Sequence, residues 1–382
     1  MKRLLWLCTH RTQWREELPL LLETGFEVIP ARWGHRERGT HENQGDPYFL
    51  QTWRQQCTLP THILEQLRSV NWFHEAPPDL IPLACEVFDG VMVESFVDSL
   101  VLIARWFPKP VFFRVFGHAG ETSYSFIAGP GPLHELKQTA CYQNGHYHWC
   151  PILPTLSFVE EEILSAGEVV LEPCVSLERL PERWQREKAE PYVAVVLSRL
   201  EAPYYQSLYR RMVSSFRRPE GAIPLRVLGQ NRQGGDALND PEIVGGLDDQ
   251  RYLETMARAT AFFYQGDSIG HLHWCVLEAL AMGVPVVMME AGFLAWALRR
   301  AIGSEAQGEV YGIVQGVDHA FSLLTQCLRD PRVAAAIAFK QQSLARHITD
   351  RDLAVKHYRA RLGAALGQPV DNPENPNYRL SA

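Results

Sequence analysis

The sequence lacks the features that mark several large classes of protein. It has no stretch of about 18 uncharged apolar residues, so no segment is predicted to span a bilayer. The apolar run Leu4–Cys8, after Lys2-Arg3, is too short for a secretory signal. Its 8 cysteines are scattered in apolar contexts without a pairing rhythm. That pattern indicates reduced thiols in the core and a cytoplasmic setting.

Charge and phosphate-binding motifs exclude further classes. The formal net charge of −7 argues against a general nucleic-acid surface, which would need an excess of Lys and Arg. The loop Gly266–Gly270 lacks the Gly-Lys-Ser/Thr of a P-loop, so ATP hydrolysis is disfavoured. One stretch, expected to be helical, is locally basic. Its basic face is either exposed to solvent or in contact with an anionic membrane or acceptor. Its arginines are Arg210, Arg211, Arg217 and Arg218.

One compact cluster contains residue types that bind zinc. It consists of Cys141, His146, His148 and Cys150 around the turn Asn144-Gly145. The spacing matches no standard structural zinc finger, so we predict no metal site there.

What the chain does contain is a repeated alternation of strand-like and helix-like segments. Its 382 residues suit two domains, and 46% hydrophobic residues can fill two cores. Strands are expected at 4–8, 26–30, 90–94, 110–118, 152–156, 169–171, 192–197, 225–229 and 284–289, and a short aromatic strand begins at 262. Helices are expected at 16–23, 98–106, 205–216, 252–259, 318–328 and 350–366. Between the halves, residues 182–191 read as a charged, exposed linker. The alternation predicts parallel sheets in two doubly wound, Rossmann-like α/β domains.

One carboxylate, Glu278, lies within an otherwise apolar helix of three turns that we expect to end at Gly283. On this helix it shares a stripe with His271, Trp274 and Cys275. That places it roughly 10 Å along the axis from His271. The distance suits a diphosphate at the helix N-terminus and a ribose diol at the carboxylate. The alternative is a pair between Glu278 and an arginine; burying an unpaired carboxylate costs several kcal/mol, so some partner must exist.

The segment around Glu278 resembles the C-terminal domain of GT-B glycosyltransferases, especially the retaining family-4 type. Residues 277–287 read Leu-Glu-Ala-Leu-Ala-Met-Gly-Val-Pro-Val-Val, similar to the family's helix and following strand. The family's second glutamate, which holds the donor ribose, corresponds to Glu278. Its first glutamate would fall at Gly270 and is therefore absent. The preceding Ser-x-x-Glu-Gly-Phe-Gly loop is not matched, which leaves the sugar and the stereochemical outcome open.

The resemblance implies an architecture and a donor site. It implies two domains facing across a cleft, with residues 1–175 on the acceptor side, residues 191–345 binding the nucleotide-sugar, and the helix at 350–366 crossing back to the first domain. Ser198-Arg199-Leu200 is similar to the family's Gly-Arg-Leu, whose arginine contacts the donor diphosphate; the family's nearby lysine is absent. Arg199 is therefore expected to stabilise the leaving group without a metal ion. The other expected donor-side residues are Gly229, Ser268, His271, Leu272 and Glu278.

The acceptor-side candidates follow strands of the first domain. A histidine in the loop after the strand at 110–118 is common in the family, so His118 is the main catalytic candidate. His10, Arg11, Glu94 and Glu121 are expected at the same edge, where they could hold the acceptor. An inverting reaction would need His118, Glu94 or Glu121 as a base, whereas a retaining one would need none.

These residues together predict a glycosyltransferase acting on a nucleotide-sugar donor and a cytoplasmic glycan, lipid-linked or protein acceptor. A surface-glycan or glycolipid precursor would fit. We expect no metal or cofactor and no nucleic-acid partner. The alternatives are a sugar-nucleotide epimerase of similar fold and a non-catalytic module that binds a nucleotide-sugar; the absent glutamate at Gly270 favours the second alternative.

Overall fold

The computed structural model describes residues 1–9, 11–31, 34–35, 39–40, 54, 56–117, 123–197, 200, 203–219, 221–229, 240–245, 247–266, 270, 272–304 and 306–368. The chain forms two compact units. The first contains Met1–Cys174 together with the C-terminal segment that starts at Asp350, and the second contains Val175–Thr349.

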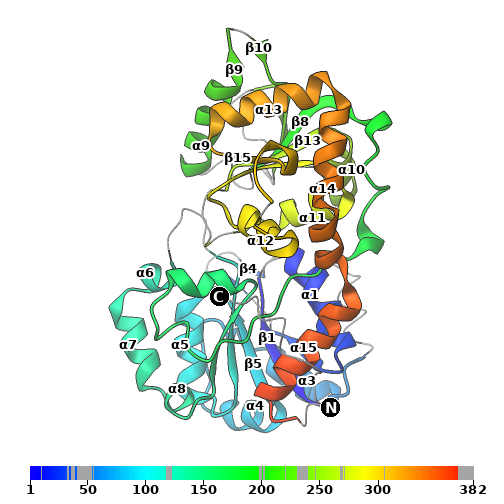
Figure 1. The fold of residues 1–382 in the computed structure, drawn as a ribbon. Coiled ribbons are helices and arrows are strands. Elements are labelled where there is room, and N and C mark those ends of the chain that lie inside the picture. Colours follow the sequence, from blue (N-terminus) through cyan, green and yellow to red (C-terminus); the bar gives the residue numbers. More distant parts are fainter. Residues whose placement is uncertain are drawn as a thin grey trace. The chain divides into compact units, whose positions relative to one another are not determined.

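The first unit is built on a five-stranded parallel sheet in the order β2-β1-β5-β6-β7. Its strands are β1 (Arg3–Leu7), β2 (Glu27–Pro30), β5 (Gly90–Glu94), β6 (Val111–Val115) and β7 (Tyr147–Pro151), and a separate two-stranded ribbon joins β3 (Gly34–His35) to β4 (Gly39–Thr40). Figure 1 shows α1 (Arg11–Glu23) and α15 (Arg351–Ala365) on one side of the sheet, and α5 (Val97–Trp106), α7 (Pro130–Gln138) and α8 (Ala140–Gln143) on the other. The remaining helices of this unit are α3 (Thr61–Arg68), α4 (Ile81–Val87), α6 (Tyr124–Ala128) and the 3-10 helix η2 (Pro154–Val159).

The last strand of this sheet differs from the one expected. The apolar segments at 152–156 and 169–171 are not strands; β7 lies just before them, at Tyr147–Pro151. Its polar residue His148 is half-buried, because the imidazole stacks on Phe112 of β6 at a ring distance of 5.2 Å. A histidine in the strand weakens the apolar pattern, which explains the misplaced prediction.

A buried ion pair joins the layers of the first unit. Arg114 of β6 and Glu17 of α1 are 0% and 1% exposed and form a salt bridge, with Arg114 Nε 2.8 Å from Glu17 Oε1. The hydroxyl of Tyr358, on α15, donates to the same carboxylate oxygen at 3.1 Å. Burial opposes the charge on Arg114, but the carboxylate of Glu17 more than offsets this and raises the pKa of Arg114. The C-terminal helix is thereby tied to the first sheet.

The second unit has a six-stranded parallel sheet in the order β12-β11-β8-β13-β14-β15. Its strands are β8 (Glu190–Val196), β11 (Leu225–Leu228), β12 (Ile243–Gly245), β13 (Ala259–Tyr264), β14 (Val286–Met289) and β15 (Ile313–Val314); β9 (Arg217–Arg218) and β10 (Gly221–Ala222) form a small hairpin. Its helices are α9 (Pro203–Phe216), α10 (Asp249–Ala257), α11 (Trp274–Met282), α12 (Phe293–Ile302), α13 (Val317–Arg329) and α14 (Pro331–Thr349), with 3-10 turns η3 (Leu177–Arg179), η4 (Arg186–Lys188) and η5 (Glu309–Tyr311).

In the second unit, successive side chains along each strand point to opposite faces of the sheet, and each face packs against helices. Val193 and Val195 of β8 and Phe263 of β13 point to the layer formed by α9, α13 and the start of α14. On the other face, α11 is buried from Cys275 to Met282 and ends where Gly283 takes the left-handed conformation at φ +79°. The predicted end of this helix is confirmed.

The charged segment expected as a linker belongs to the second unit. Its charged residues Glu182, Arg183, Glu187 and Lys188 are exposed, as predicted. Trp184 is not free in solvent, because its indole N–H donates to the carbonyl of Ala259 at 2.8 Å. The segment is thus anchored to the sheet next to β13.

Two further findings concern the predicted setting. All 8 cysteines are free thiols. Of the helices that the structure describes, none is both long and apolar enough to cross a membrane.

One buried amide completes the hydrogen bonding of β14 before its pairing with β15 begins. Gln341 of α14 is 2% exposed; its carbonyl accepts from the N–H of Val286 at 3.0 Å, and its amide donates to the carbonyls of Val286 and Tyr311 at 2.7 and 2.8 Å. The side chain therefore acts as a backbone partner where a neighbouring strand would otherwise stand.

We expect Gln341→Ala to lower the free energy of unfolding by about 2–4 kcal/mol, because buried backbone groups lose their partners and a small cavity forms. Chemical denaturation would measure the loss. The matched control is Gln342→Ala, which alters the exposed neighbour on the same helix and should cost less than about 0.5 kcal/mol. Equal effects from the two variants would contradict the assigned role of the Gln341 amide.

Candidate functional site

The strand order of the second unit defines where a ligand would bind. The chain leaves β8 for β11 on one side and later crosses to β13 on the other side. In open parallel sheets, ligands bind outside the carboxyl ends of the two strands that flank such a reversal. The segments that follow β8 and β13 are therefore the candidate donor site, and they contain the predicted residues Arg199, Ser268, His271 and Leu272.

Glu278 has the partner that its burial required. Its carboxylate is 5% exposed and lies 2.6 Å from Nη2 of Arg179, which stands in η3 and is 23% exposed. The hydroxyl of Tyr252, on α10, also hydrogen-bonds to Glu278. Burial, and then the charge of Glu278, raises the pKa of Tyr252 well above its usual value. Glu278 is thus held by a cation and a neutral donor within one unit.

The helix that carries Glu278 begins later than expected. Its first residue is Trp274, so Glu278 lies about 6 Å along the axis from the helix start. The predicted spacing of roughly 10 Å from the first helical turn is therefore wrong. A contact of Glu278 with a ribose remains compatible with a phosphate bound in the loop before Trp274.

The loops after β13 and β14 approach each other through glycines. A Cβ on Gly292 would lie 2.2 Å from the carbonyl oxygen of Gly266, and one on Gly266 would meet the ring of Tyr264 at 2.6 Å. The hydroxyl of Tyr264 accepts from the N–H of His273, at the N-cap of α11. The absence of side chains at the two glycines keeps this edge of the sheet compact.

Two polar atoms of the same loop lack a hydrogen-bond partner among the described residues. They are Oε1 of Gln265, just after β13, and Nε1 of Trp274, the first residue of α11. Buried polar atoms are nearly always paired, by the protein, by water or by a ligand. A hydrogen-bond donor and an acceptor are thus available beside the candidate donor site.

The structure describes only some of the remaining predicted donor-side residues. Arg199, Ser268 and His271 lie outside the described residues. Leu272 is buried at 5% exposure, so any contact with a ligand would come from its backbone. Gly229 directly follows β11, at the carboxyl edge of the sheet. Gly270, where the family's first glutamate would stand, is half-buried.

The first unit has its own reversal, between β1 and β5. Glu94 ends β5 and is 3% exposed, and its Oε2 accepts a hydrogen bond from the backbone N–H of Thr9 at 2.7 Å. This contact joins the carboxyl ends of the two strands that flank the reversal. Glu94 therefore lies where a ligand of this unit is expected.

The residue after Glu94 is strained. Ser95 has φ +54°, in the left-handed region that costs a non-glycine residue about 1–2 kcal/mol. Its hydroxyl lies 3.2 Å from that of Tyr124, at the start of α6, and the Tyr124 hydroxyl donates to the carbonyl of Gly117 at 3.2 Å. Strain of this kind concentrates at functional sites.

The other acceptor-side predictions cannot be followed in space. His10, His118 and Glu121 lie outside the described residues, and Arg11 begins α1 but its side chain is outside them.

Residues of the cluster of zinc-ligand types, and arginines of the basic stretch, form hydrogen bonds or ion pairs with other residues of the chain. No group of His, Cys, Asp or Glu side chains that could hold a metal ion occurs in the described part of the chain. His146 and His148 each hydrogen-bond through Nδ1 to a backbone carbonyl, and burial raises the pKa of the Cys141 and Cys150 thiols to about 12. In the basic stretch, Arg217 pairs with Asp240 and Glu242, and Arg218 pairs with Asp318. This basic surface is therefore partly neutralised.

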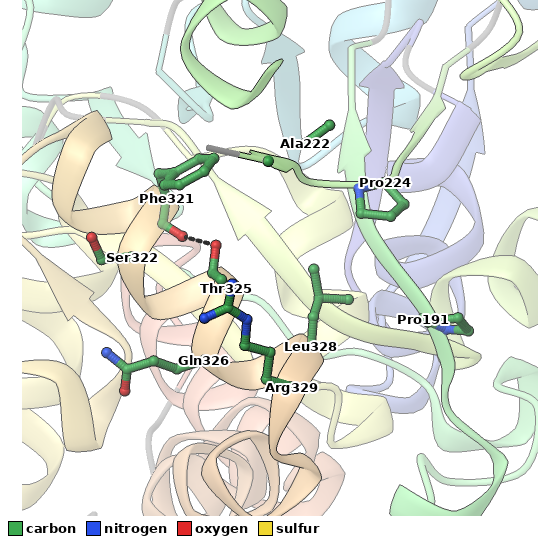
Figure 2. Close-up of a pocket in the computed structure, with 10 residues that line it drawn as sticks. Pro191, Ala222, Pro224, Phe321, Ser322, Thr325, Gln326, Leu328 and Arg329 are labelled. Carbon is green, nitrogen blue, oxygen red and sulfur yellow. Dashed lines mark hydrogen bonds between the residues drawn. The ribbon is translucent and has the colours of Figure 1, made fainter. Parts of the chain in front are cut away.

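A pocket of about 510 Å³ lies at the opposite end of the second sheet. Figure 2 shows Pro191 and Pro224 facing Phe321, Thr325 and Leu328 of α13. Pro191 stands at the start of β8 and Pro224 just before β11, so the pocket is at the amino ends of these strands. It is separate from the candidate donor site.

Sequence reasoning missed four residues that build these edges: Arg179, Tyr252, Ser95 and Tyr124. Arg179 is 99 positions from Glu278, and no local pattern connects them. A search for the required partner of Glu278 among arginines near the unit boundary would have been the available signal. The positive φ of Ser95 has no sequence signal, since glycine or asparagine is typical of that conformation.

Comparisons with known proteins identify the fold. No protein-family model matches the chain, and no curated protein matches it in sequence. Among solved structures, Anabaena HepE in complex with UDP is similar with a TM-score of 0.62 at 13% identity, over 95% of this chain and 100% of HepE. A glycosyltransferase from Rickettsia africae gives 0.61 at 11% identity, over 96% and 98%. The O-GlcNAc transferase of Thermobaculum terrenum gives 0.56 at 16%, over 96% and 68%.

The chain therefore has the GT-B fold of these solved glycosyltransferases, as the resemblance implied. At these identities, the likeness concerns the fold.

The Arg179–Glu278 pair can be tested through stability. Arg179→Met leaves a buried carboxylate without its counter-charge and should lower the free energy of unfolding by about 1–3 kcal/mol, less than for a fully buried pair because Arg179 is partly exposed. Denaturation followed by fluorescence would measure it. The control is Arg332→Met, which removes the exposed partner of Asp330 and should cost less than about 0.5 kcal/mol. Equal losses would show that the Arg179–Glu278 pair contributes no more than a surface pair.

Proposed function

We propose that this protein is a GT-B glycosyltransferase that transfers a sugar from a nucleotide-sugar to a cytoplasmic acceptor, such as a surface-glycan or glycolipid precursor. The observation that carries the proposal is a strand-order reversal in each of two parallel sheets, with buried polar groups at both carboxyl edges. One edge suits a donor and the other an acceptor.

The donor side is assigned to the second unit. Glu278 would accept hydrogen bonds from the ribose diol, and a carboxylate has enough acceptor sites to do so while bound to Arg179. The polar atoms of Gln265 and Trp274 would bind the nucleotide-sugar beside it. Arg199, carried over from the family's motif, would bind the diphosphate.

The nucleotide to test first is UDP. HepE has been solved with UDP, with UDP and glucose, and with UDP-glucose, at 13–14% identity to this chain. The likeness to the retaining family-4 type rests on residues 277–287 and gives no preference for a particular nucleotide.

In the proposed reaction, an acceptor hydroxyl oxygen bonds to the anomeric carbon of the sugar. The bond from that carbon to the phosphate oxygen breaks, and the nucleoside diphosphate leaves with the electron pair. In an inverting reaction the hydroxyl proton passes to a base, for which His118, Glu94 and Glu121 are the candidates. In a retaining reaction it passes to the leaving diphosphate, and Arg199 stabilises the charge. Neither course requires a divalent metal.

Two other functions are the alternatives. An epimerase of this fold would convert the nucleotide-sugar into its epimer without any acceptor, and a binding module would leave the nucleotide-sugar unchanged. The glycine at position 270, where the family has a glutamate, is the observation that favours the binding module. Nucleotide release from UDP-glucose, GDP-mannose and CMP-sialic acid, measured with and without a panel of sugar and lipid acceptors, separates the transferase from both alternatives, and analysis of the sugar left on the nucleotide separates the epimerase from the binding module. Release that depends on an acceptor is expected.

We expect Glu278→Gln to weaken nucleotide binding by about 1–3 kcal/mol, the scale of a charge-assisted hydrogen bond. Calorimetry with UDP, GDP and CMP would measure it, and thermal unfolding of the variant would show that the site is still folded. Unchanged affinity for whichever nucleotide binds the wild type would remove Glu278 from the donor site.

We expect His118→Ala to abolish transfer and leave nucleotide affinity nearly intact. His118 belongs to the first unit, whereas the proposed nucleotide contacts belong to the second. The control is His134→Ala, which alters an exposed histidine on α7 and should leave transfer unchanged. Near-normal turnover of His118→Ala would mean that another group is catalytic, and a loss of nucleotide binding would mean that the site is wrongly divided.

A further inference from the structure

The hydroxyl of Tyr124 links the ends of two strands in the first unit. It is 3.2 Å from the Ser95 hydroxyl, just after β5, and 3.2 Å from the carbonyl oxygen of Gly117, just after β6. A carbonyl can only accept, so Tyr124 uses its one proton there, and the Ser95 hydroxyl must donate to the Tyr124 oxygen. The contacts form a directed chain from Ser95 through Tyr124 to Gly117.

Tyr124 is itself held in place from several sides. Its ring packs edge-on against Phe113 of β6 and Trp149 of β7, at 5.6 and 6.2 Å. Its backbone N–H donates to Glu160 at 2.8 Å, which fixes the start of α6. Burial raises the pKa of Tyr124 to about 12, so the hydroxyl keeps its proton at neutral pH. The side chain is therefore a rigid donor.

The hydrogen bonds of Tyr124 reach Ser95, the residue directly after Glu94. Ser95 holds a left-handed backbone conformation at φ +54°, and its N–H donates to the carbonyl of Arg114 at 3.0 Å. Glu94, the residue directly before this turn, accepts a hydrogen bond from the N–H of Thr9. The ends of β1, β5 and β6 are thereby connected at the point where the strand order reverses.

We infer that Tyr124 is a positioning residue of the acceptor site, acting through Ser95 on Glu94. The inference rests on the proposed function in its inverting form, with Glu94 as the base that accepts the proton of the acceptor hydroxyl. As that proton transfers, the oxygen bonds to the anomeric carbon and the nucleoside diphosphate leaves with the electron pair. A displacement of Glu94 by about 1 Å would slow such a step by up to about 100-fold.

Tyr124→Phe removes the hydroxyl and keeps the packed ring. The matched control is Tyr147→Phe: Tyr147 is equally buried and its hydroxyl also donates to a backbone carbonyl, that of Leu164, but it stands at the amino end of β7. UDP release from UDP-glucose is measured with methyl glucoside as the probe acceptor, and hydrogen exchange of the Thr9 amide is followed in parallel.

The inference predicts that Tyr124→Phe lowers kcat about 10- to 100-fold with UDP affinity unchanged, and speeds Thr9 exchange. Ser95→Ala should lower kcat similarly, and the double variant should lose little more. Tyr147→Phe, with a similar change in Tm, should alter neither readout. A kcat of Tyr124→Phe within about twofold of wild type, additive losses, or equal losses in Tyr147→Phe would overturn the inference.

The two proposals fail in different ways. If the wild type releases no UDP with any acceptor, transfer from this donor is refuted, and Thr9 exchange still decides whether Tyr124 positions Glu94. Unchanged Thr9 exchange in Tyr124→Phe would overturn the positioning role even if transfer is observed.

Discussion

The buried ion pair between Arg114 and Glu17 is the interaction on which the first unit depends. It joins a strand, β6, to a helix, α1, and its hydrogen bonds to Tyr358 bring in α15 from the far end of the chain. Two buried charges are costly to desolvate, and a pair persists where further hydrogen bonds satisfy both partners. The carbonyl of Cys150 supplies one more, to Arg114 at 3.3 Å. One strand and two helices, β6, α1 and α15, thus meet at one guanidinium.

The same residue connects this core to the candidate acceptor edge. The backbone carbonyl of Arg114 accepts from the N–H of Ser95, the strained residue that follows Glu94. A left-handed serine persists only when its surroundings fix it more firmly than the strain opposes. Arg114 therefore contacts α1 and α15 through its side chain and the turn after Glu94 through its backbone carbonyl.

Local patterns predicted most strands and helices, because apolar periodicity and glycine ends act within a few residues. The end of α11 at Gly283 is such a case. β7 was misplaced, since His148 interrupts its apolar pattern and is accommodated by a ring in the next strand. For the site, burial of Glu278 predicted that a partner exists but not that it is Arg179, because the pair forms across 99 positions. Contacts of that kind arise from packing, which a local pattern does not encode.

The two carboxyl edges are built in different ways, and the difference supports the division of roles. In the first unit, side chains hydrogen-bond the strand ends to one another through Glu94, Ser95 and Tyr124. In the second, the loops approach through glycine backbones, and Gln265 and Trp274 keep polar atoms without partners in the described structure. Each such atom costs about 1–3 kcal/mol, which a hydrogen-bonding ligand removes when it binds. Binding free energy is therefore available at the second edge, while the first edge holds its groups in fixed geometry.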